Sequence, residues 1–217
     1  MKGDLVAAES ILSEIAENIR RCQKCELSHS RKNAVPGTGP ANAEIMLIGE
    51  GPGFHENEQG LPFVGASGKF LTQLLNDGGV PRNTVFITNV IKCRPPGNRD
   101  PQEQELKACS IFLDKQIEAI NPLIIITLGR FSMARYFENA RISKIHGQAV
   151  WRDGRLIVPM YHPAAALHQP KLRSVIMHDF AQLKDLISKE KERVATAAAS
   201  ANIGKNEEDD ATQLSFF

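Results

Sequence analysis

The sequence predicts an α/β fold in which three layers, helix, sheet and helix, surround a central, mostly parallel four-stranded sheet. Four short apolar segments follow one another along the chain, with helix-like apolar spacing between them. The apolar segment at 123–128 lacks polar alternation, as is typical of a central strand covered on both faces. The expected strands are 44–48, 85–91, 123–128 and 155–160, and the expected helices are 4–20, 67–77, 101–120, 130–138 and 174–194.

The chain of 217 residues is long enough for one domain and a tail. We expect the domain at 1–190 and a disordered acidic tail at 191–217, because hydrophobicity falls there and acidic residues accumulate. The net charge of +1 permits nucleic-acid binding without demanding it. The sequence shows no membrane-spanning stretch and no signal peptide, so we expect a cytoplasmic protein.

A glycine-rich turn, GEGPG at 49–53, follows the first expected strand. Its glycines let the backbone approach a ligand closely, but their spacing does not match a dinucleotide fingerprint. Parallel strands present their carboxyl ends at one edge of the sheet, where ligands bind. We therefore expect four residues to converge at that edge, namely Glu50, Phe63, Asn89 and His162.

The chain has four cysteines, of which the first two form a C-x-x-C pair. Four thiolates that converge in space suit tetrahedral zinc or an iron–sulfur cluster. Unlinked structural cysteines and redox chemistry remain alternatives, and the spacing alone does not choose the metal. The four residues are Cys22, Cys25, Cys93 and Cys109.

Five motifs, in this order, resemble the family 4 uracil-DNA glycosylases, the iron–sulfur-containing branch of that superfamily. The resemblance covers roughly residues 20–187 and implies a monofunctional enzyme that hydrolyses the N-glycosidic bond of uracil in DNA, initiating base excision repair. It also implies that the four cysteines hold a [4Fe–4S] cluster. The motifs are GEGPG (49–53), GLPFVGASG (60–68), TNVIKCRPPGNR (88–99), Cys109 with its following helix, and HPAAAL (162–167).

The chemistry of the four edge residues fits that activity. Phe63 offers an aromatic face to a flipped base, and the amide of Asn89 can accept from uracil N3–H while donating to O4. With cytosine, the amino group at C4 would face the amide nitrogen of Asn89, so one hydrogen-bond donor would oppose another. By resemblance, His162 stabilises negative charge on uracil O2, and Glu50 orients water or offsets the sugar cation.

Three further residues near the expected site receive weaker assignments. By resemblance, Gly51 is expected to bind substrate. It stands where family 1 enzymes carry a water-activating aspartate, and family 4 shares this change. Glu56 is a second candidate for that task, although a solvated loop charge is the more ordinary expectation. His146 lies where a related branch captures the sugar covalently, although DNA contact or packing is the more ordinary expectation.

Other segments are expected to contact DNA or a protein partner. Leu167 resembles the wedge that fills the gap left by a flipped base, with Arg173 near the backbone, and Arg94 could meet a phosphate. The terminal Gln213–Phe217 (QLSFF) resembles the peptide by which bacterial repair and replication proteins bind the sliding clamp, although it could instead fold back on its own domain. Nothing demands a dimer, so we expect a monomer.

Each site residue also has an ordinary structural explanation as a turn cap, core side chain or surface loop. The rival function is a non-catalytic damage sensor that binds uracil-containing DNA, or a protein that traps it covalently through His146. A pure binder has no need of Glu50, Asn89 and His162 together, which favours the enzyme.

Overall fold

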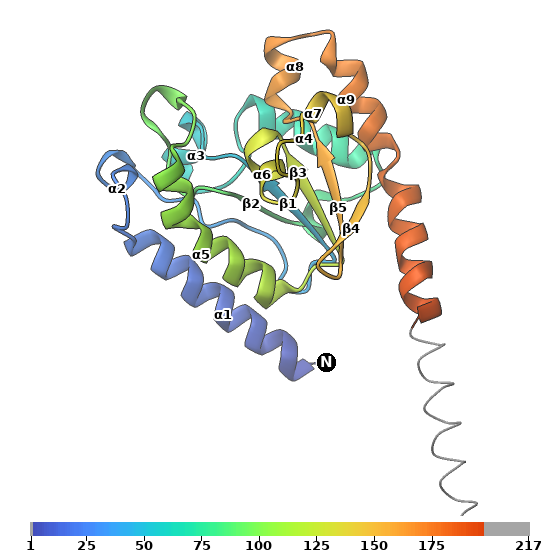
Figure 1. Ribbon diagram of the computed structural model, residues 1–217. Coiled ribbons are helices and arrows are strands. Elements are labelled where there is room, and N and C mark those ends of the chain that lie inside the picture. The colour runs from blue at the N-terminus through green and yellow to red at the C-terminus, as the bar shows by residue number, and fades with distance from the viewer. Residues whose placement is uncertain (1, 198–217) are drawn as a thin grey trace, which may run out of the picture.

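The computed structural model describes residues 2–197, which form a central sheet with helices on both faces (Figure 1). The sheet has five strands in the order β2-β1-β3-β5-β4. Four strands are parallel and match the expected segments, and the fifth is antiparallel to its neighbour. The strands are β1 (Ile45–Gly49), β2 (Phe86–Asn89), β3 (Ile124–Leu128), β4 (Val150–Arg152) and β5 (Arg155–Met160).

The prediction of four strands was wrong by one, because strand β4 was not expected. Strand β4 is short and exposed, so it lacks the apolar run that marks the other strands. It pairs with β5 through a tight turn at Asp153 and Gly154, whose φ angles are 50° and 74°. An Asp-Gly pair with two positive φ angles is the usual two-residue hairpin turn, so the turn was the available signal.

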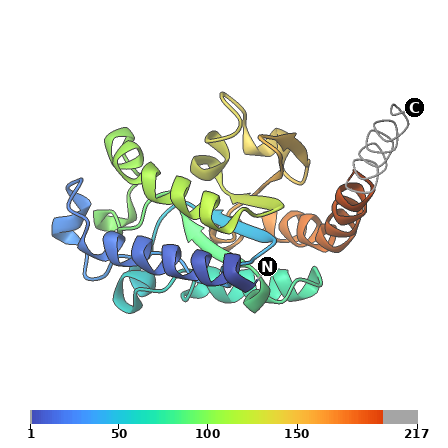
Figure 2. The ribbon, with the colours of Figure 1, turned by 90° about the horizontal axis from the view of Figure 1, so that it is seen from below.

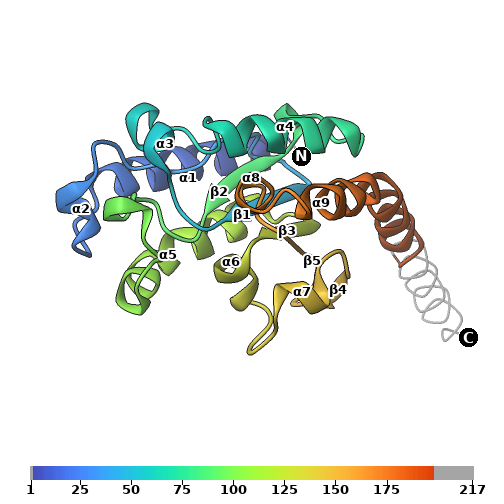
Figure 3. The same cartoon turned by 90° about the horizontal axis from the view of Figure 1, so that it is seen from above.

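Helices cover the two faces of the sheet separately, as Figure 3 shows from above. Helices α4, α8 and α9 pack one apolar cluster against one face, while α5, α6 and α7 pack a second cluster against the other. Helix α1 packs on α5 outside the sheet (Figure 2). The helices are α1 (Lys2–Arg21), α2 (Leu27–Ser30), α3 (Phe54–Gln59), α4 (Ala66–Asp77), η1 (Arg82–Thr84), η2 (Pro96–Asn98), α5 (Glu103–Ile120), α6 (Arg130–Ala134), α7 (Ile142–Ile145), α8 (Ala164–His168) and α9 (Leu172–Ala181).

The last described helix runs over residues 183–197, past the boundary expected at 190. Trp151 of β4 holds it, because the indole Nε1 donates to Glu190 at 3.1 Å and the Arg193 guanidinium lies 3.9 Å from the ring centroid. Residues 198–217, including Gln213–Phe217, lie outside the described residues. Among residues 2–197, no helix is long and apolar enough to cross a membrane.

The register of the sheet fixes where the site lies. Gly49, the last residue of β1, pairs with Asn89, the last residue of β2. Leu128, at the end of β3, pairs with Met160, at the end of β5. All four parallel strands therefore end at one edge, and the residues that follow them are brought together there, as expected for a ligand site in an open α/β sheet.

Candidate active site

A cavity of about 220 Å³ opens at the carboxyl edge of the sheet. It brings together Gly51, Glu56, Phe63, Asn89 and His162, all of which the sequence had marked. Of the other lining residues, Ser67, Asn98 and Ala164 lie within the motifs quoted above but were given no role of their own. The full lining is Gly51, Gly53, Glu56, Phe63, Ser67, Asn89, Asn98, His162, Ala164 and His168.

Asn89 presents an unused hydrogen-bonding group to this cavity. The residue is 2% exposed, and within the described part of the chain its Oδ1 is buried without a hydrogen-bond partner. Gly49 lies directly behind it, because a Cβ there would come within 2.4 Å of that oxygen. A buried polar atom without a partner costs free energy unless a ligand satisfies it. The Oδ1 of Asn89 is therefore free to accept a hydrogen bond from a ligand that donates one.

His162 is held as a neutral imidazole with a defined tautomer. Burial lowers the pKa of His162 to about 4. The backbone N–H of Ala164 donates to its Nδ1 at 3.1 Å. Since Nδ1 accepts, the proton of the neutral ring is on Nε2. The residue can therefore donate a hydrogen bond from Nε2 without carrying a charge.

Phe63 is the aromatic wall of the cavity and is held in an unusual backbone conformation. Its φ is 52°, and its ring lies nearly parallel to the imidazole of His162, with centroids 5.4 Å apart at an interplanar angle of 27°. A positive φ is strained for a bulky residue, so the surrounding structure must hold it. Both rings line the cavity.

Three residues fix this strained loop. The Glu56 Oε1 accepts from the backbone N–H groups of Val64 and Gly65 at 2.8 and 2.9 Å. The Arg82 Nη2 donates to the carbonyl of Phe63 at 3.0 Å. A Cβ on Gly68 would lie 1.9 Å from that carbonyl oxygen, so only glycine fits there.

Glu56 is therefore not a solvated loop charge. It is 7% exposed and binds the backbone of the loop that carries Phe63. Nothing in its own sequence position indicates this role, because its two partners follow it by eight and nine residues. Arg82 was missed for the same reason.

Glu50 lies beside the cavity rather than in its lining. It follows β1 directly, and its backbone carbonyl accepts from Ile91 N–H at 3.1 Å. Burial raises the pKa of Glu50, Asp100 raises it further, and Arg130 opposes the shift. Arg130 itself is paired with Asp100. The Glu50 carboxylate is thus partly buried at the carboxyl end of β1, close enough to Asp100 and Arg130 to interact with both.

The next residue, Gly51, has no room for a side chain. A Cβ at this position would come within 2.7 Å of the Ile91 side chain. An aspartate in place of Gly51 therefore requires the Ile91 side chain to shift.

His146 is not part of the cavity lining. Its Nδ1 lies 2.8 Å from the Asp179 carboxylate, and its ring centroid lies 4.9 Å from that of Tyr161. These contacts tie helix α7 to α9 at the edge of β5. They correspond to the packing that sequence reasoning named as the ordinary alternative.

Helix α8 borders the cavity and presents an exposed apolar side chain. Leu167 is 47% exposed, and its neighbour His168 lines the cavity. Arg173 lies behind it, with its guanidinium 4.3 Å from the Phe70 ring centroid and its Nη2 3.4 Å from Gln73 Oε1. This arrangement is compatible with a wedge at Leu167, whereas Arg173 is anchored to helix α4.

The four cysteines come from three separate parts of the sequence, and all of them line one small apolar cavity. None forms a disulfide. Burial is the main cause that raises the pKa of Cys109 to about 11. Hydrogen-bond donors reach the sulfurs, since Arg31 Nη1 lies 3.1 Å from Cys93 Sγ and the backbone N–H of Lys24 lies 3.5 Å from Cys22 Sγ. The apolar shell and the N–H donors fit an iron–sulfur cluster.

A single metal ion fits this cavity less well. Among residues 2–197, no three His, Cys, Asp or Glu side chains are close enough together to hold a metal ion.

Lys92 links the cysteines to the cavity and, within residues 5–197, is the largest of the fully buried side chains. Its Nζ donates to the Asn89 carbonyl at 2.9 Å and to Gln116 Oε1 at 2.7 Å, and burial lowers its pKa to about 8. These bonds fix the end of β2, and so the backbone of Asn89, against helix α5. This contact could not be predicted from the sequence, because a lysine is seldom fully buried.

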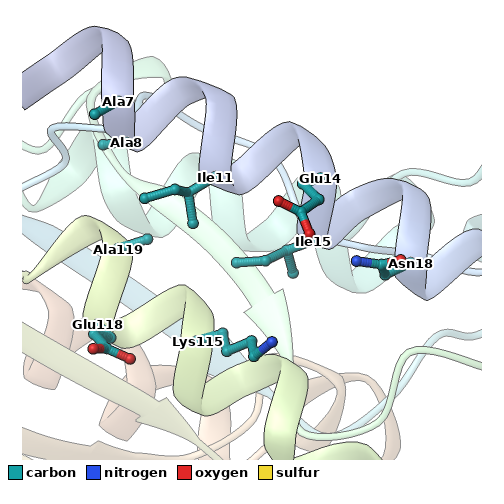
Figure 4. A pocket seen from close by; sticks show the side chains of 9 residues that line it. All are labelled: Ala7, Ala8, Ile11, Glu14, Ile15, Asn18, Lys115, Glu118 and Ala119. Atoms are coloured by element: carbon teal, nitrogen blue, oxygen red, sulfur yellow. The ribbon is translucent and has the colours of Figure 1, made fainter.

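A larger hollow, about 490 Å³, lies between α1 and α5 (Figure 4). Ile11 and Ile15 form its apolar floor, with Lys115 and Glu118 beside it. It has no strand ends and no buried polar atom without a partner among its residues. The smaller cavity at the carboxyl edge therefore remains the candidate active site.

Known proteins resemble this chain over most of its length. Residues 36–184 match the family model described as "Uracil DNA glycosylase superfamily". The type-4 uracil-DNA glycosylase of Saccharolobus solfataricus is 50% identical over 187 residues, covering 82% of this chain and 87% of the relative. That of Archaeoglobus fulgidus is 42% identical, covering 82% and 94%. That of Thermotoga maritima is 38% identical, covering 84% and 97%. The chain thus belongs to the uracil-DNA glycosylase superfamily, and within it to the type-4 family of these relatives.

Proposed function

We propose that the protein is a monofunctional uracil-DNA glycosylase, which hydrolyses the N-glycosidic bond of uracil in DNA and so initiates base excision repair. Membership of the type-4 family supports this activity. The observation that carries the proposal is the buried, unpartnered Oδ1 of Asn89, at the end of a cavity walled by Phe63 and His162.

The cavity suits uracil by its hydrogen-bonding pattern. Asn89 Oδ1 accepts from uracil N3–H, and the amide nitrogen donates to O4. Cytosine carries an amino group at C4 and no proton on N3, so each group of this amide would face a like group. A buried mismatch of this kind costs about 1–3 kcal/mol. Phe63 supplies the stacking surface that a base taken out of the duplex requires.

Cleavage of the C1′–N1 bond leaves its electron pair on uracil and a cation on the sugar. Neutral His162 donates a hydrogen bond from Nε2 to O2 of the base, where the negative charge grows. A preorganised donor of this kind stabilises the transition state more than the ground state. At the rim, the Glu50 carboxylate offsets the sugar cation and orients the water that attacks C1′.

The same lining argues for hydrolysis without strand cleavage. A bifunctional enzyme needs an amine that forms a Schiff base with the sugar. No lysine is among the ten described residues that line the cavity. The Nζ of the buried Lys92 is not available either, because it donates hydrogen bonds to Asn89, Thr88 and Gln116.

The base-recognition step is tested by replacing Asn89 with aspartate. Asn89→Asp keeps the shape but replaces the donor with a carboxylate oxygen facing uracil O4, so we expect kcat/KM for uracil excision to fall about 5- to 150-fold. Asn98→Asp is the matched control, because Asn98 lines the same cavity while its Oδ1 already accepts from Arg94 Nε at 2.7 Å. If Asn89→Asp excises uracil as fast as Asn98→Asp, Asn89 does not read the base.

We further propose that Cys22, Cys25, Cys93 and Cys109 hold a [4Fe–4S] cluster. The shared apolar cavity of the four thiols and the N–H donors to their sulfurs support it. When bound, the cluster cross-links three segments of the fold, and no redox step is needed for glycosidic hydrolysis. The segments are the end of α1 with the loop before α2, the loop after β2, and α5.

DNA binding is proposed at the same edge of the sheet. Leu167 fills the gap that the flipped nucleotide leaves, since it is exposed next to the cavity. Arg173 approaches the backbone from helix α9, although its stacking on Phe70 limits its reach. We propose a monomer that acts in the cytoplasm, where reducing conditions keep free thiols from forming disulfides.

The segment Gln213–Phe217 is proposed to bind the bacterial sliding clamp. Two adjacent aromatic residues in a polar, acidic segment would expose apolar surface to water unless a partner buries them. A tether to the clamp raises the local concentration of the enzyme on DNA. Deletion of Gln213–Phe217 should abolish clamp binding in a pull-down assay and leave excision from a free oligonucleotide unchanged. Clamp binding that survives the deletion would refute this role.

A further inference from the structure

Phe54 is a large aromatic side chain that the fold leaves exposed beside the cavity. It is 54% exposed at the start of helix α3, immediately after Gly53, which lines the cavity. Among the large hydrophobic side chains exposed within residues 5–197, only Phe54 and Leu167 are sequence neighbours of lining residues. Leu167 has a proposed task as the wedge, and Phe54 has none.

The ring of Phe54 is held in place although it is exposed. The Arg94 guanidinium carbon lies 5.3 Å from the ring centroid, and the His55 ring stands edge-on to it at 5.5 Å and 81°. Arg94 Nε in turn donates to Asn98 Oδ1 at 2.7 Å, and Asn98 lines the cavity. Phe54 and Arg94 are thus tied to the cavity from two sides, by Gly53 in the chain and by Asn98 in space.

This exposed ring does little for folding, because the residues of α3 that are buried are Glu56 and Asn57. An ordered aromatic face next to a guanidinium suits a nucleotide, whose base stacks on the ring and whose phosphate is attracted by the cation. The position is continuous with the site for the target base, so the base it can reach is a neighbour of the uracil along the same strand.

We propose that Phe54, backed by Arg94, is a stacking platform for a base adjacent to the target uracil. This inference rests on the proposed glycosylase function and adds a residue that positions the DNA strand. In single-stranded DNA no complementary strand holds that neighbouring base in a stack. The platform therefore contributes most on single-stranded substrates, where it replaces the stacking that the duplex would supply.

The test is kcat/KM for uracil excision from a short single-stranded oligonucleotide. We expect Phe54→Ala to lower it about 5- to 150-fold, the range for loss of one stacked base. Phe54→Trp keeps an aromatic face and should stay within about threefold of the unaltered protein. Leu61→Ala is the control, because Leu61 is similarly exposed, at 47%, but adjoins no lining residue.

Two modified oligonucleotides isolate the stacking contact from other effects of the substitution. One carries an abasic residue in place of the base on the 5′ side of the uracil, and the other carries it on the 3′ side. On the substrate that lacks the stacked base, Phe54→Ala and the unaltered protein should differ by less than about twofold, as in a double-mutant cycle. An equal loss on both abasic substrates, or no loss on the intact strand, would overturn the platform.

The two proposals fail in different ways. If the unaltered protein excises no uracil, the glycosylase assignment fails. Binding of the same oligonucleotides, followed by fluorescence anisotropy, then still decides the platform, because stacking contributes to affinity as well as to rate. Equal affinities of the unaltered protein and Phe54→Ala for the intact strand would overturn it in that case.

Discussion

Replacement of His162 by alanine is expected to lower the rate constant of uracil excision about 10²- to 10³-fold, as loss of one preorganised donor does in other enzymes. The reason is the tautomer, because the Ala164 N–H occupies Nδ1 and leaves the Nε2 proton for the leaving base. Single-turnover kinetics should show the loss in the chemical step. His168→Ala, at another lining histidine, is the control and should lose much less activity.

The pH profile of the unaltered enzyme tests the neutral state of His162. An ordinary histidine titrates near pH 6.5, whereas burial holds the pKa of His162 at about 4. The ring therefore stays neutral down to about pH 4, and activity should show no step near pH 6.5. A step there that disappears in His162→Ala would mean that the charged imidazolium acts instead.

Glu50 gives the acid limb of the same profile. Its pKa is raised, chiefly by burial, so protonation begins at a higher pH than for an exposed glutamate. Activity that depends on the ionised carboxylate is lost as the pH falls through that raised value. Glu50→Gln should lower the plateau and remove the limb, whereas Glu56→Gln, which keeps an acceptor for the Val64 and Gly65 N–H groups, should retain the limb.

The lowered pKa of His162 also makes the stability of the fold depend on pH. The unfolded chain binds a proton at this residue below about pH 6.5, and the folded protein does so only below about pH 4. Its contribution to the free energy of unfolding is therefore full above pH 6.5, falls as the pH drops between these two values, and stays constant below about pH 4.

Replacement of Cys109 by serine is the second large effect that we expect. The proposed cluster joins three segments that are far apart in sequence, so losing a ligand frees the chain as removal of a cross-link does. By analogy with a disulfide, the cost is about 2–5 kcal/mol. For a domain of this size that lowers the midpoint of thermal unfolding by roughly 4–20 °C. Iron content and visible absorbance should fall with it.

Ser28→Ala is a matched control for that substitution. Ser28 lines the same cavity as the cysteines, and within residues 2–197 its Oγ is buried without a hydrogen-bond partner. Removing that hydroxyl should leave the iron content and the unfolding midpoint unchanged or raise the midpoint slightly. If Cys109→Ser retained the iron and the midpoint of the unaltered protein, Cys109 would not be a ligand.

Much of the fold and site could be predicted because the signals are local. Each parallel strand is a short apolar run, and Glu50, Asn89 and His162 each end or follow such a run. The parallel arrangement then placed these residues at one edge. Strand β4 was not predicted because it is exposed and only three residues long.

The support of the site could not be predicted, because it depends on partners distant in sequence. Glu56 reaches the loop of Phe63 through two backbone N–H groups, and Arg82 reaches it from nineteen residues away. Gly68 was expected as part of a motif, but its reason is the carbonyl of Phe63, which leaves no room for a Cβ. Such contacts exist only after the chain has folded.

The central claim is tested most directly by one gel assay. Anaerobically purified protein is incubated with a labelled oligonucleotide that carries a single uracil, and hot alkali then cleaves any abasic site. We expect cleavage at the uracil, none in the matched thymine oligonucleotide, and none before the alkali step. An intact uracil strand after incubation with protein that retains its iron would contradict the glycosylase assignment, and a covalent protein–DNA band would instead direct attention to His146.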